Sequence, residues 1–459
     1  MFQGRASELK ILKENYDHQG FRMVVLYGRR RVGKSYLMQH FLEGIHTPII
    51  AFQAIENSKA LSIEAFQEAI FDVYPASFET HLSSWKDCFR YIHEHCGNDK
   101  LILYIDEVNY IFREDPSFAS ILQEEVDHHL IHKNVMMILC GSNISSIENE
   151  ILNENAPLYG RRSLSIHLEE FNYKEASAFY PTYSPADRII AYSVFGGKGK
   201  YLAAINPSKS IKDNIIAQIL TPGGSLADEI TLLLKNDFRD PTFYQQLLYT
   251  MSLGNTTFND IKTKMNEEAA KVSTYLNKLI ESRIVIKKEV NGGKRNDSRY
   301  FIQDRFLSFY FRFVYKRLNI LNVLIKPETF YERFIEKDLS TYVGMQFESI
   351  CEQYIITQSL EGKLPFLPLE YGKYYGKRKD GSTYDIDVYF ADDEHALCGE
   401  CKFTNRSFTL SDMKQLMEDA KCTKKDGIDY YVFYKTSVDE SVLQLCPSAH
   451  LVSLEKLYD

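Results

Sequence analysis

Short apolar runs alternate with amphipathic stretches over the first 205 residues of the chain. Four of the runs have the length and composition of buried strands: residues 23–28, 47–52, 100–108 and 135–142. Stretches between them, such as 58–72 and 115–132, have the spacing of helices. Because strands that alternate with helices indicate βαβ units, we predict a parallel sheet covered by helices. Residues 172–240 have a mostly helical pattern, which predicts a helical lid.

The pattern changes after residue 240. Three short amphipathic stretches are followed by two strand-like segments around Asn291-Gly292-Gly293, a strong hairpin turn signal. On the third stretch, apolar residues recur at helical spacing and form one stripe: Val272, Tyr275, Leu276, Leu279 and Ile280. Three helices followed by a β-hairpin predict a winged helix-turn-helix domain.

A third pattern covers the end of the chain. It begins with a helical stretch, continues with strand-like runs at 383–391 and 395–403, and ends with a helix at 411–421 and a strand at 429–435. The chain is therefore predicted to be α/β, with three domains at 1–235, 236–320 and 335–459.

The composition is that of a soluble globular protein, since 44% of the 459 residues are hydrophobic and 25% are charged. No run of 18 apolar residues occurs, and the start of the chain lacks the apolar stretch of a signal peptide. We therefore expect a cytoplasmic protein without a membrane partner. The eight cysteines are too scattered for a disulfide framework, and Cys398 and Cys401 form a single CxxC without a second pair, which argues against zinc.

Charge is unevenly distributed along the chain. The net charge of −8 argues against a protein that coats nucleic acid indiscriminately. Residues 241–320, however, hold 14 Lys and Arg against 7 Asp and Glu, a balance of +7 that leaves −15 for the rest. A basic segment in an acidic chain predicts one localised anionic partner, and DNA is the partner we expect.

Residues 28–35, GRRRVGKS, form a complete G-x-x-x-x-G-K-S motif between a predicted strand and a predicted helix. The glycines let backbone N–H groups converge on a phosphate, and the helix adds the positive end of its dipole. Lys34 is expected to reach the β- and γ-phosphates and Ser35 to ligate Mg²⁺, so ATP and Mg²⁺ are the predicted cofactors. The residues expected to bind the nucleotide are Gly28, Arg29, Arg30, Arg31, Val32, Gly33, Lys34, Ser35 and Tyr36.

A second motif supports this prediction. The apolar run 100–108 ends on Asp106 and Glu107, which is the form of a Walker B motif. Asp106 would hold Mg²⁺, while Glu107 would orient and polarise the attacking water. The alternative is an acidic strand end that caps the next helix. The phosphate motif upstream favours the catalytic interpretation, and we predict an ATPase.

Together these motifs resemble those of prokaryotic ATPases on the border of the AAA+ and STAND groups. The resemblance runs over nearly the whole chain and implies a P-loop domain, a winged helix and a C-terminal domain related to PD-(D/E)XK nucleases, with a restriction-endonuclease-like fold. Residues 2–9 look like the opening box of the family, which implies that Arg5 lies near the adenine. CGSN at 140–143 lies where such ATPases place a polar sensor, so Ser142 or Asn143 is expected in that role.

Two further strings carry the resemblance. PLYGRRSL at 157–164 implies that Arg161 or Arg162 contacts phosphate charge, either in the same subunit or across subunits of a homo-oligomer. The alternative is a surface arginine pair on a solvated turn. VFGGKGKYL at 194–202 corresponds to a Gly-Gly-x-Pro motif that touches the base, although Gly199 stands where proline is usual.

Near the end of the chain, Asp387, Glu400 and Lys402 fit the D…E-x-K pattern of metal-dependent nucleases. A hairpin between 387 and 400 would bring Asp387 beside Glu400, where two carboxylates can hold Mg²⁺. Lys402, on the same strand face as Glu400, could stabilise developing charge or position the water nucleophile. The resemblance adds Glu348, on the preceding helix, as a further acidic ligand. A solvated sheet edge is the alternative.

Three functions are compatible with these observations. The first is an ATPase coupled to DNA binding through a winged helix, with a metal-dependent nuclease domain. The second is a STAND-like regulatory switch in which the winged helix only packs within the chain and the nuclease-like domain is inactive. The third is a scaffold that ATP stabilises without turnover. We rank them in this order.

Overall fold

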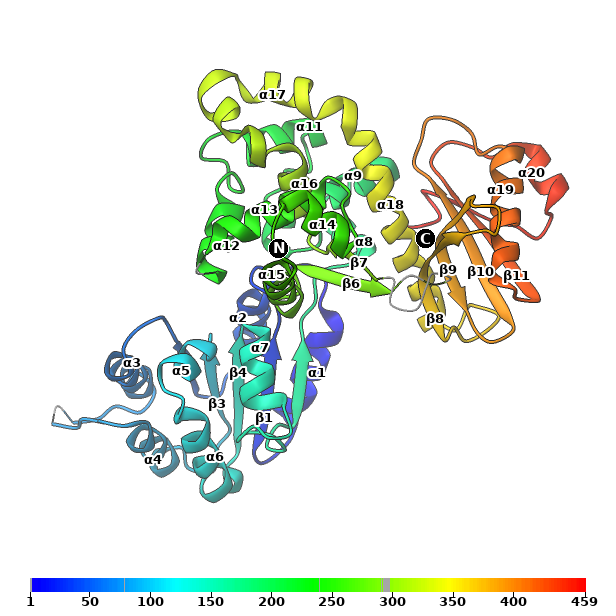
Figure 1. Cartoon of the computed structure of the whole chain (residues 1–459). Helices are drawn as coiled ribbons and strands as arrows, with labels where there is room; N and C mark the ends of the chain where they lie inside the picture. The colour runs from blue at the N-terminus through cyan, green and yellow to red at the C-terminus, as the bar shows by residue number, and fades with distance from the viewer. Residues whose placement is uncertain (1, 78, 239, 290, 292–297) are drawn as a thin grey trace. The chain divides into compact units, whose positions relative to one another are not determined.

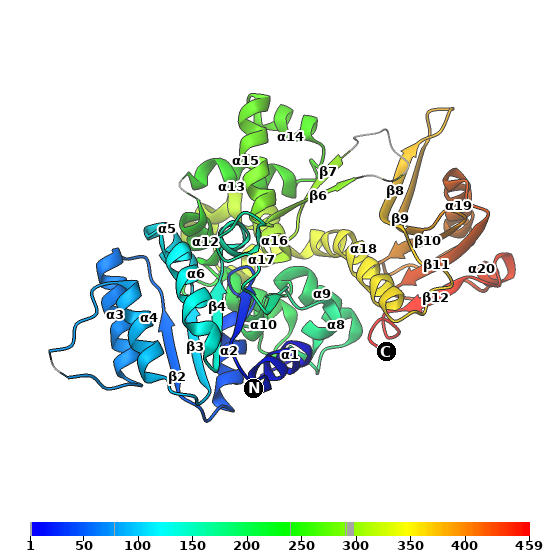
Figure 2. The same cartoon turned by 90° about the horizontal axis from the view of Figure 1, so that it is seen from below.

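The apolar runs of the first 170 residues form a five-stranded parallel sheet in the computed structural model of this chain (Figures 1 and 2). The strands are β1 Arg22–Tyr27, β2 Ile49–Gln53, β3 Leu101–Asp106, β4 Val135–Gly141 and β5 Leu164–His167, in the spatial order β2-β3-β4-β1-β5. All four predicted strands are present. β5 was not predicted, because its four residues are too few and too exposed to form an apolar run.

Helices cover both faces of this sheet. They are α1 Ala6–Asp17, α2 Lys34–Glu43, α3 Lys59–Phe71, α4 Trp85–His95, α5 Asn109–Glu114, α6 Phe118–His128 and α7 Ile144–Ile147. Alternate residues of β1 show the two layers, since Met23 and Val25 pack with α3, α4 and α6, whereas Val24 and Leu26 pack with α1 and α2. Burial on both faces explains the continuous apolar runs. This is the P-loop NTPase fold that the sequence predicts.

The structure describes every residue except 1, 78, 239, 290 and 292–297. The chain divides into two units, Met1–Glu170 and Phe171–Asp459. Residues 171–235, which were predicted as a lid on the first domain, share a hydrophobic core with the helices that follow them in the second unit. The three-domain division at 1–235, 236–320 and 335–459 stays a prediction.

The second unit begins with helices and a two-stranded antiparallel sheet. Its helices are α8 Tyr173–Ala176, α9 Pro185–Phe195, α10 Gly199–Ala203, α11 Ile211–Asn214, α12 Glu229–Asp237, α13 Pro241–Ser252, α14 Phe258–Met265, α15 Ala269–Glu281, α16 Arg305–Phe313, α17 Pro327–Phe334 and α18 Glu336–Leu360. The sheet pairs β6 Val285–Glu289 with β7 Ser298–Ile302.

The order α13, α14, α15, β6, β7 is the order of elements predicted for a winged helix. The apolar stripe of α15 is confirmed, because Val272, Leu276 and Leu279 are buried and Tyr275 and Ile280 pack against the same core. The identification as a winged helix stays a prediction. Gly292 and Gly293 of the turn, with the neighbouring Lys294 and Arg295, lie outside the described residues.

The chain ends in a mixed five-stranded sheet with the order β12-β11-β10-β9-β8. Its elements are β8 Glu370–Lys377, β9 Thr383–Ala391, β10 His395–Lys402, α19 Leu410–Ala420, β11 Gly427–Tyr434, α20 Glu440–Leu445 and β12 His450–Ser453. β8, β9 and β10 are antiparallel, whereas β10, β11 and β12 are parallel. The helix α18 packs on one face and α19 on the other. This separate α/β sheet agrees with the predicted class, while its assignment as restriction-endonuclease-like stays a prediction.

The turn after β1 passes very close to the end of β5. Leu168 donates its N–H to the carbonyl of Tyr27 at 2.7 Å, which draws the two segments together at Gly28. A Cβ atom on Gly28 would lie 2.3 Å from the carbonyl oxygen of Leu168. Only glycine fits this backbone approach.

Gly28→Ala is therefore expected to destabilise the first unit by about 1–3 kcal/mol, the usual effect of overpacking. Thermal denaturation without nucleotide measures the change. Gly44→Ala is the matched control, because a Cβ there meets only the carbonyl of Phe41 at 3.9 Å. Equal melting temperatures for the two variants would contradict the close approach.

Candidate functional site

The phosphate loop, residues 28–35, joins the end of β1 to the start of α2. Lys34 is the first residue of α2, and only 5% of its surface is exposed. Its ammonium group donates to the carbonyl oxygens of Gly28 at 2.8 Å and Arg29 at 3.1 Å. Burial lowers the pKa of Lys34, and the nearby Cys140, Glu107 and Asp106 oppose that change. The loop thus holds a desolvated cation against its own carbonyls, where an anionic ligand would find a charge partner.

Ser35 and Asp106 meet beside this lysine. The Ser35 hydroxyl donates to Asp106 Oδ2 at 3.0 Å, and Asp106 Oδ1 accepts the N–H of Glu107 at 2.9 Å. Asp106 ends β3 and Ser35 follows the end of β1, and parallel strands end at the same edge of a sheet. A hydroxyl and a carboxylate are the hard oxygen ligands that Mg²⁺ prefers, so this pair fits that ion.

Glu107 stands in a strained backbone conformation next to the pair. Its φ of 52° lies in the left-handed region, which costs a residue other than glycine about 1–3 kcal/mol. Its carboxylate accepts a hydrogen bond of 2.6 Å from the hydroxyl of Ser142, which follows β4. The N–H of Ser142 in turn donates to the buried Asn109 Oδ1 at 3.0 Å. Arg31, inside the loop, is also left-handed with φ 74°.

The two candidates for a polar sensor have different surroundings. Ser142 contacts the carboxylate of Glu107. Asn143 is exposed, and its Oδ1 caps α7 by accepting the N–H of Ser146 at 3.0 Å. From the sequence, Ser142 or Asn143 was expected as the sensor, with Asn143 as the residue that binds the nucleotide, and that role of Asn143 stays a prediction; of the two, only Ser142 contacts the carboxylate of Glu107.

Arg5 lies against the phosphate loop. Only 7% of the surface of Arg5 is exposed. Its guanidinium donates to the carbonyls of Val32 at 3.3 Å and Glu169 at 2.6 Å, and it pairs with Glu8 at 3.1 Å. These contacts tie the start of α1 to the loop and to the segment after β5. A contact between Arg5 and the adenine stays a prediction.

Other side chains of the loop reach outward from it. Arg29 pairs with Glu170 at 3.6 Å, and Arg30 donates to the Tyr110 hydroxyl at 2.8 Å. Tyr36, on the first turn of α2, is 52% exposed. The loop is thus fixed at several points by its own arginines, while Tyr36 is open to solvent.

Arg161 and Arg162 lie at the other end of the sheet. Ser163, the next residue, donates its N–H to the carbonyl of Met23 near the start of β1, whereas the phosphate loop follows the end of β1. Arg161 makes a two-point contact with Asp127 at 3.1 and 2.9 Å. A six-residue strand spans roughly 17 Å, so a phosphate contact within one subunit is incompatible with this placement. Only a contact across subunits stays a prediction.

The carboxylates of the second unit gather where the sequence places them. β9 and β10 form the predicted hairpin, and their register pairs Val388 with Gly399, which brings Asp387 beside Glu400. Asp387 Oδ2 accepts the N–H of Cys401 at 3.0 Å. Glu400 forms an ion pair with Lys402. The expectation that these residues lie together is met, and their chemical role stays a prediction.

Lys373, on β8, lies among these carboxylates, and the sequence did not reveal it. Its ammonium lies 3.2 Å from Glu348, 3.2 Å from Asp385 and 3.3 Å from Asp387. β8 was not predicted as a strand, because EYGKYYGK contains two glycines and no aliphatic run. Asp385 was also missed, although it lies two residues before Asp387.

The acidic cluster consists of Glu348, Asp385, Asp387 and Glu400, and burial raises the pKa of several of these carboxyl groups. Burial, followed by the neighbouring Asp387, raises the pKa of Glu348 to about 8 and that of Glu400 to about 7. Burial also raises the pKa of Asp385, against the effect of Lys373. For Lys402, burial lowers the pKa, but the contact with Glu400 outweighs it and the net shift is upward.

The acidic cluster does not fit a divalent cation in this arrangement. Three of its carboxylates converge on the Lys373 ammonium. Over the described part of the chain, no group of three or more His, Cys, Asp or Glu side chains is arranged to hold a metal ion. Of the three residues predicted to hold a metal here, Glu348 and Asp387 thus share Lys373, and Glu400 pairs with Lys402.

Four polar residues form the exposed face of α15. Lys271, Thr274, Asn277 and Lys278 lie opposite or beside the buried stripe, and all are exposed. Lys271 forms an ion pair with Glu267 at 3.1 Å, one turn away.

The hairpin that follows α15 has contacts within the second unit. Lys288 of β6 pairs with Glu352 of α18 at 2.8 Å, and Arg299 of β7 lies over the Tyr375 ring at 4.7 Å. The two strands therefore pack against the C-terminal part of the unit.

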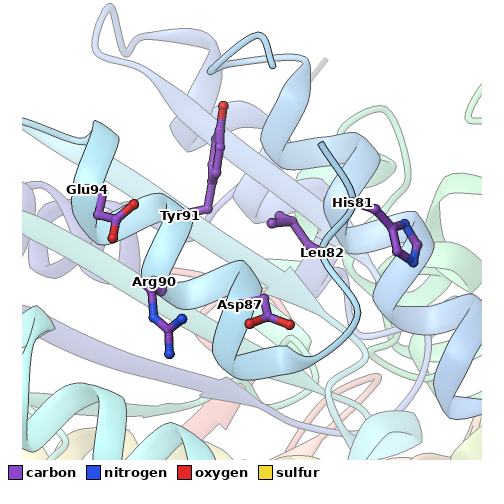
Figure 3. Close-up of a pocket in the computed structure, with 6 residues that line it drawn as sticks. All are labelled: His81, Leu82, Asp87, Arg90, Tyr91 and Glu94. Carbon is purple, nitrogen blue, oxygen red and sulfur yellow. The ribbon is translucent and has the colours of Figure 1, made fainter. Parts of the chain in front are cut away.

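A small hollow of about 160 Å³ lies on the surface of the first unit (Figure 3). His81, Leu82, Asp87, Arg90, Tyr91 and Glu94 line it, on α4 and the segment before it. It contains none of the predicted site residues. Charges of both signs surround it, so its lining indicates no particular ligand.

Comparison with known proteins supports the ATPase interpretation. Residues 2–205 match the model of a family described as an ATPase domain predominantly from Archaea. Residues 310–416 match a second model, described as Archaea bacterial proteins of unknown function. No helix within the described residues is long and apolar enough to cross a membrane.

Individual relatives agree with these matches. The uncharacterized protein MJECL04 of Methanocaldococcus jannaschii is 28% identical over 445 residues, which cover 96% of each chain. The uncharacterized ATP-binding protein MJ0423 of the same organism is 44% identical over 43 residues, 9% of this chain and 73% of that protein. The Walker-type ATPase paby2304 of Pyrococcus abyssi is 18% identical with a TM-score of 0.50, over 68% of this chain and 96% of that chain, a likeness that shows the fold alone.

Replacing each of the two sensor candidates by alanine distinguishes their roles. Ser142→Ala should slow ATP hydrolysis about tenfold, because the Glu107 carboxylate loses the hydrogen bond that it accepts from the Ser142 hydroxyl, while ATP binding stays unchanged. Asn143→Ala is the matched control and should cost about 0.5–2 kcal/mol of stability through the lost cap, at an unchanged turnover rate. Steady-state hydrolysis and nucleotide titration measure both. An equal loss of turnover in the two variants would refute the assignment of Ser142.

Proposed function

We propose that this chain, which contains an archaeal-type P-loop ATPase domain, binds ATP at residues 28–35 and hydrolyses it with Glu107 as the residue that acts on the attacking water. The observation that carries the proposal is the convergence of Lys34, Asp106 and Glu107 at the carboxyl ends of β1 and β3, two parallel strands of one sheet. A cation, a metal-binding carboxylate and a catalytic carboxylate are the groups that phosphoryl transfer requires.

Binding uses the loop and the start of α2. Backbone N–H groups of the loop and the N-terminal end of α2 attract the phosphates, and the Lys34 ammonium exchanges its carbonyl partners for phosphate oxygens. Ser35 and Asp106 would hold Mg²⁺, which neutralises phosphate charge when it is bound. Because Lys34 is already desolvated, its attraction for an anion is only weakly screened.

Hydrolysis uses the polar groups that follow β3 and β4. Glu107 orients the water and accepts its proton as the new P–O bond forms and the bond from the γ-phosphorus to the leaving ADP breaks. The Ser142 hydroxyl fixes one carboxylate oxygen of Glu107, so the other can face the water. Arg161 and Arg162, from a second subunit, would add positive charge in a homo-oligomer.

A second function, nucleic-acid binding, is favoured by the exposed face of α15. Two lysines and two neutral polar residues lie on that face, within a segment whose charge balance is +7. Such a helix can contact phosphates and a groove of DNA. We propose DNA as the anionic partner of this face.

The competing proposal is a regulatory switch in which the same helices and hairpin pack within the chain. The ion pair between Lys288 and Glu352 supports that role for β6 and β7, but it does not involve the exposed face of α15. We propose no nuclease reaction for the acidic cluster, since Lys373 lies where a metal ion would be needed.

Lys34→Ala should abolish tight ATP binding, because the loop loses the cation that faces the β- and γ-phosphates. Glu107→Gln should bind ATP normally and hydrolyse it at least about a hundredfold more slowly, since an amide cannot accept the proton. Nucleotide titration and phosphate release measure the two effects. Wild-type turnover in Glu107→Gln would show that another group acts on the water.

The double variant Lys271→Ala/Lys278→Ala should bind duplex DNA more weakly at low salt, and its logarithmic salt slope should fall by about 1–2. Lys10→Ala/Lys13→Ala is the matched control, because it removes the same charge from two exposed lysines of α1, each of which, like Lys271, pairs with an acidic residue one turn away. Fluorescence anisotropy at several salt concentrations measures both variants. The same affinity in the two variants would exclude α15 as the DNA-binding face.

A further inference from the structure

Lys373 is surrounded by the acidic cluster, since its ammonium donates to Glu348 at 3.2 Å and to Asp387 at 3.3 Å and forms an ion pair with Asp385. A lysine ammonium has three N–H donors, and three carboxylates lie within 3.3 Å of this one: Glu348 from α18, and Asp385 and Asp387 from β9. The lysine therefore joins two elements that are far apart in the sequence. Its side chain is 38% exposed, so a metal ion could reach the cluster from solvent if the ammonium moved away.

The backbone of β9 is adapted to this lysine. The register between β8 and β9 pairs Gly372 with Tyr389 and Tyr374 with Ile386, so Asp387 and Val388 both lie opposite Lys373. Two residues opposite one is a β-bulge, and a bulge turns a side chain away from the regular alternation. The bulge explains how Ile386 and Val388, two residues apart, pack in different cores on opposite faces of the sheet. It aims the carboxylate of Asp387 at Lys373.

A residue of the β6–β7 connection holds β8 on both sides of Lys373. Asn291 Nδ2 donates to the carbonyl of Tyr371 at 3.0 Å, and the carbonyl of Asn291 accepts the N–H of Tyr375 at 3.0 Å. These bonds occupy the outer edge of β8, which is the edge strand of its sheet.

The same hairpin also contacts the other element that carries a member of the cluster. Lys288 pairs at 2.8 Å with Glu352, which lies one helical turn after Glu348 on α18. The β6–β7 hairpin thus touches both the strand that carries Lys373 and the helix that carries Glu348.

We propose that Lys373 is a built-in cation that takes the place of a divalent metal in the acidic cluster, and that the β6–β7 hairpin, through Asn291, holds it there. Lys373 is a positioning residue in this arrangement, since it orders the carboxylates and closes the site to other cations. Divalent ions need direct oxygen ligands at about 2.0–2.6 Å, a space that the ammonium now fills. The proposal is independent of ATP hydrolysis by the first unit.

Binding of Mn²⁺ to the full chain, measured by electron paramagnetic resonance of the free ion, tests the proposal. All variants carry Asp106→Asn, which weakens the metal site of the first unit. Lys373→Met should bind Mn²⁺ at least about tenfold more tightly than the parent chain, because a neutral side chain leaves the carboxylates uncompensated. Lys377→Met, which removes an exposed charge from the same strand, is the matched control and should bind as the parent does.

Two further variants locate the effect. Asp387→Asn added to Lys373→Met should return the affinity to the parent value, which places the new site in the acidic cluster. Asn291→Ala keeps Lys373 and should still tighten Mn²⁺ binding several-fold, so the proposal remains testable if Lys373→Met fails to fold. Parent-like affinity in a folded Lys373→Met would overturn the role of the lysine, and parent-like affinity in Asn291→Ala would overturn the role of the Asn291 side chain, because this variant removes only the bond from Nδ2 to Tyr371.

Discussion

The position of β4 between β1 and β3 controls the chemistry of the first unit. Neighbouring strands lie about 4.8 Å apart, so the ends of β1 and β3 are separated by roughly 10 Å. The Ser35 hydroxyl and the Asp106 carboxylate nevertheless meet at 3.0 Å beyond the strand ends. A Cβ on Gly141 would lie 2.6 Å from the Ile147 side chain and 3.1 Å from Asn109 Oδ1. Because β4 ends on Gly141, Asn109 can accept the N–H of Ser142, and the Ser142 hydroxyl in turn donates to Glu107.

The two units compensate their buried charges in opposite ways. In the first unit, the buried cation Lys34 is satisfied by neutral carbonyls, which leaves its positive charge available to an incoming anion. In the second unit, the carboxylates already share Lys373, and Glu400 has Lys402. Burying charge without a partner is costly, so both arrangements stabilise the structure without ligand. Only the arrangement around Lys34, however, leaves a positive charge available to a ligand.

The sequence predicted what depends on local pattern and missed what depends on register. Continuous apolar runs identified β1 to β4, and the spacing of Glu400 and Lys402 placed them together correctly. β5 and β8 were missed because one is short and the other contains glycine and tyrosine in place of aliphatic residues. Lys373 could not be assigned without the bulge at Asp387 and Val388, since a bulge has no reliable local signal. The position of Arg161 could not be predicted for a similar reason, because only the pairing of β5 with β1 shows at which end of the sheet this residue lies.

From the sequence, DNA binding and packing within the chain are alternative functions of the segment that contains α15 and the hairpin after it. The structure assigns them to different surfaces. A winged helix that packs within its chain and one that binds DNA are alternatives if both uses need the same surface. Here the intrachain contacts belong to Lys288, Asn291 and Arg299, on the hairpin and its connection. The exposed lysines of α15 lie on the helix instead. The two surfaces belong to elements that share one hydrophobic core, so the contacts of the hairpin help to fix the orientation in which α15 presents its lysines. Packing within the chain and DNA binding are then compatible uses of one module.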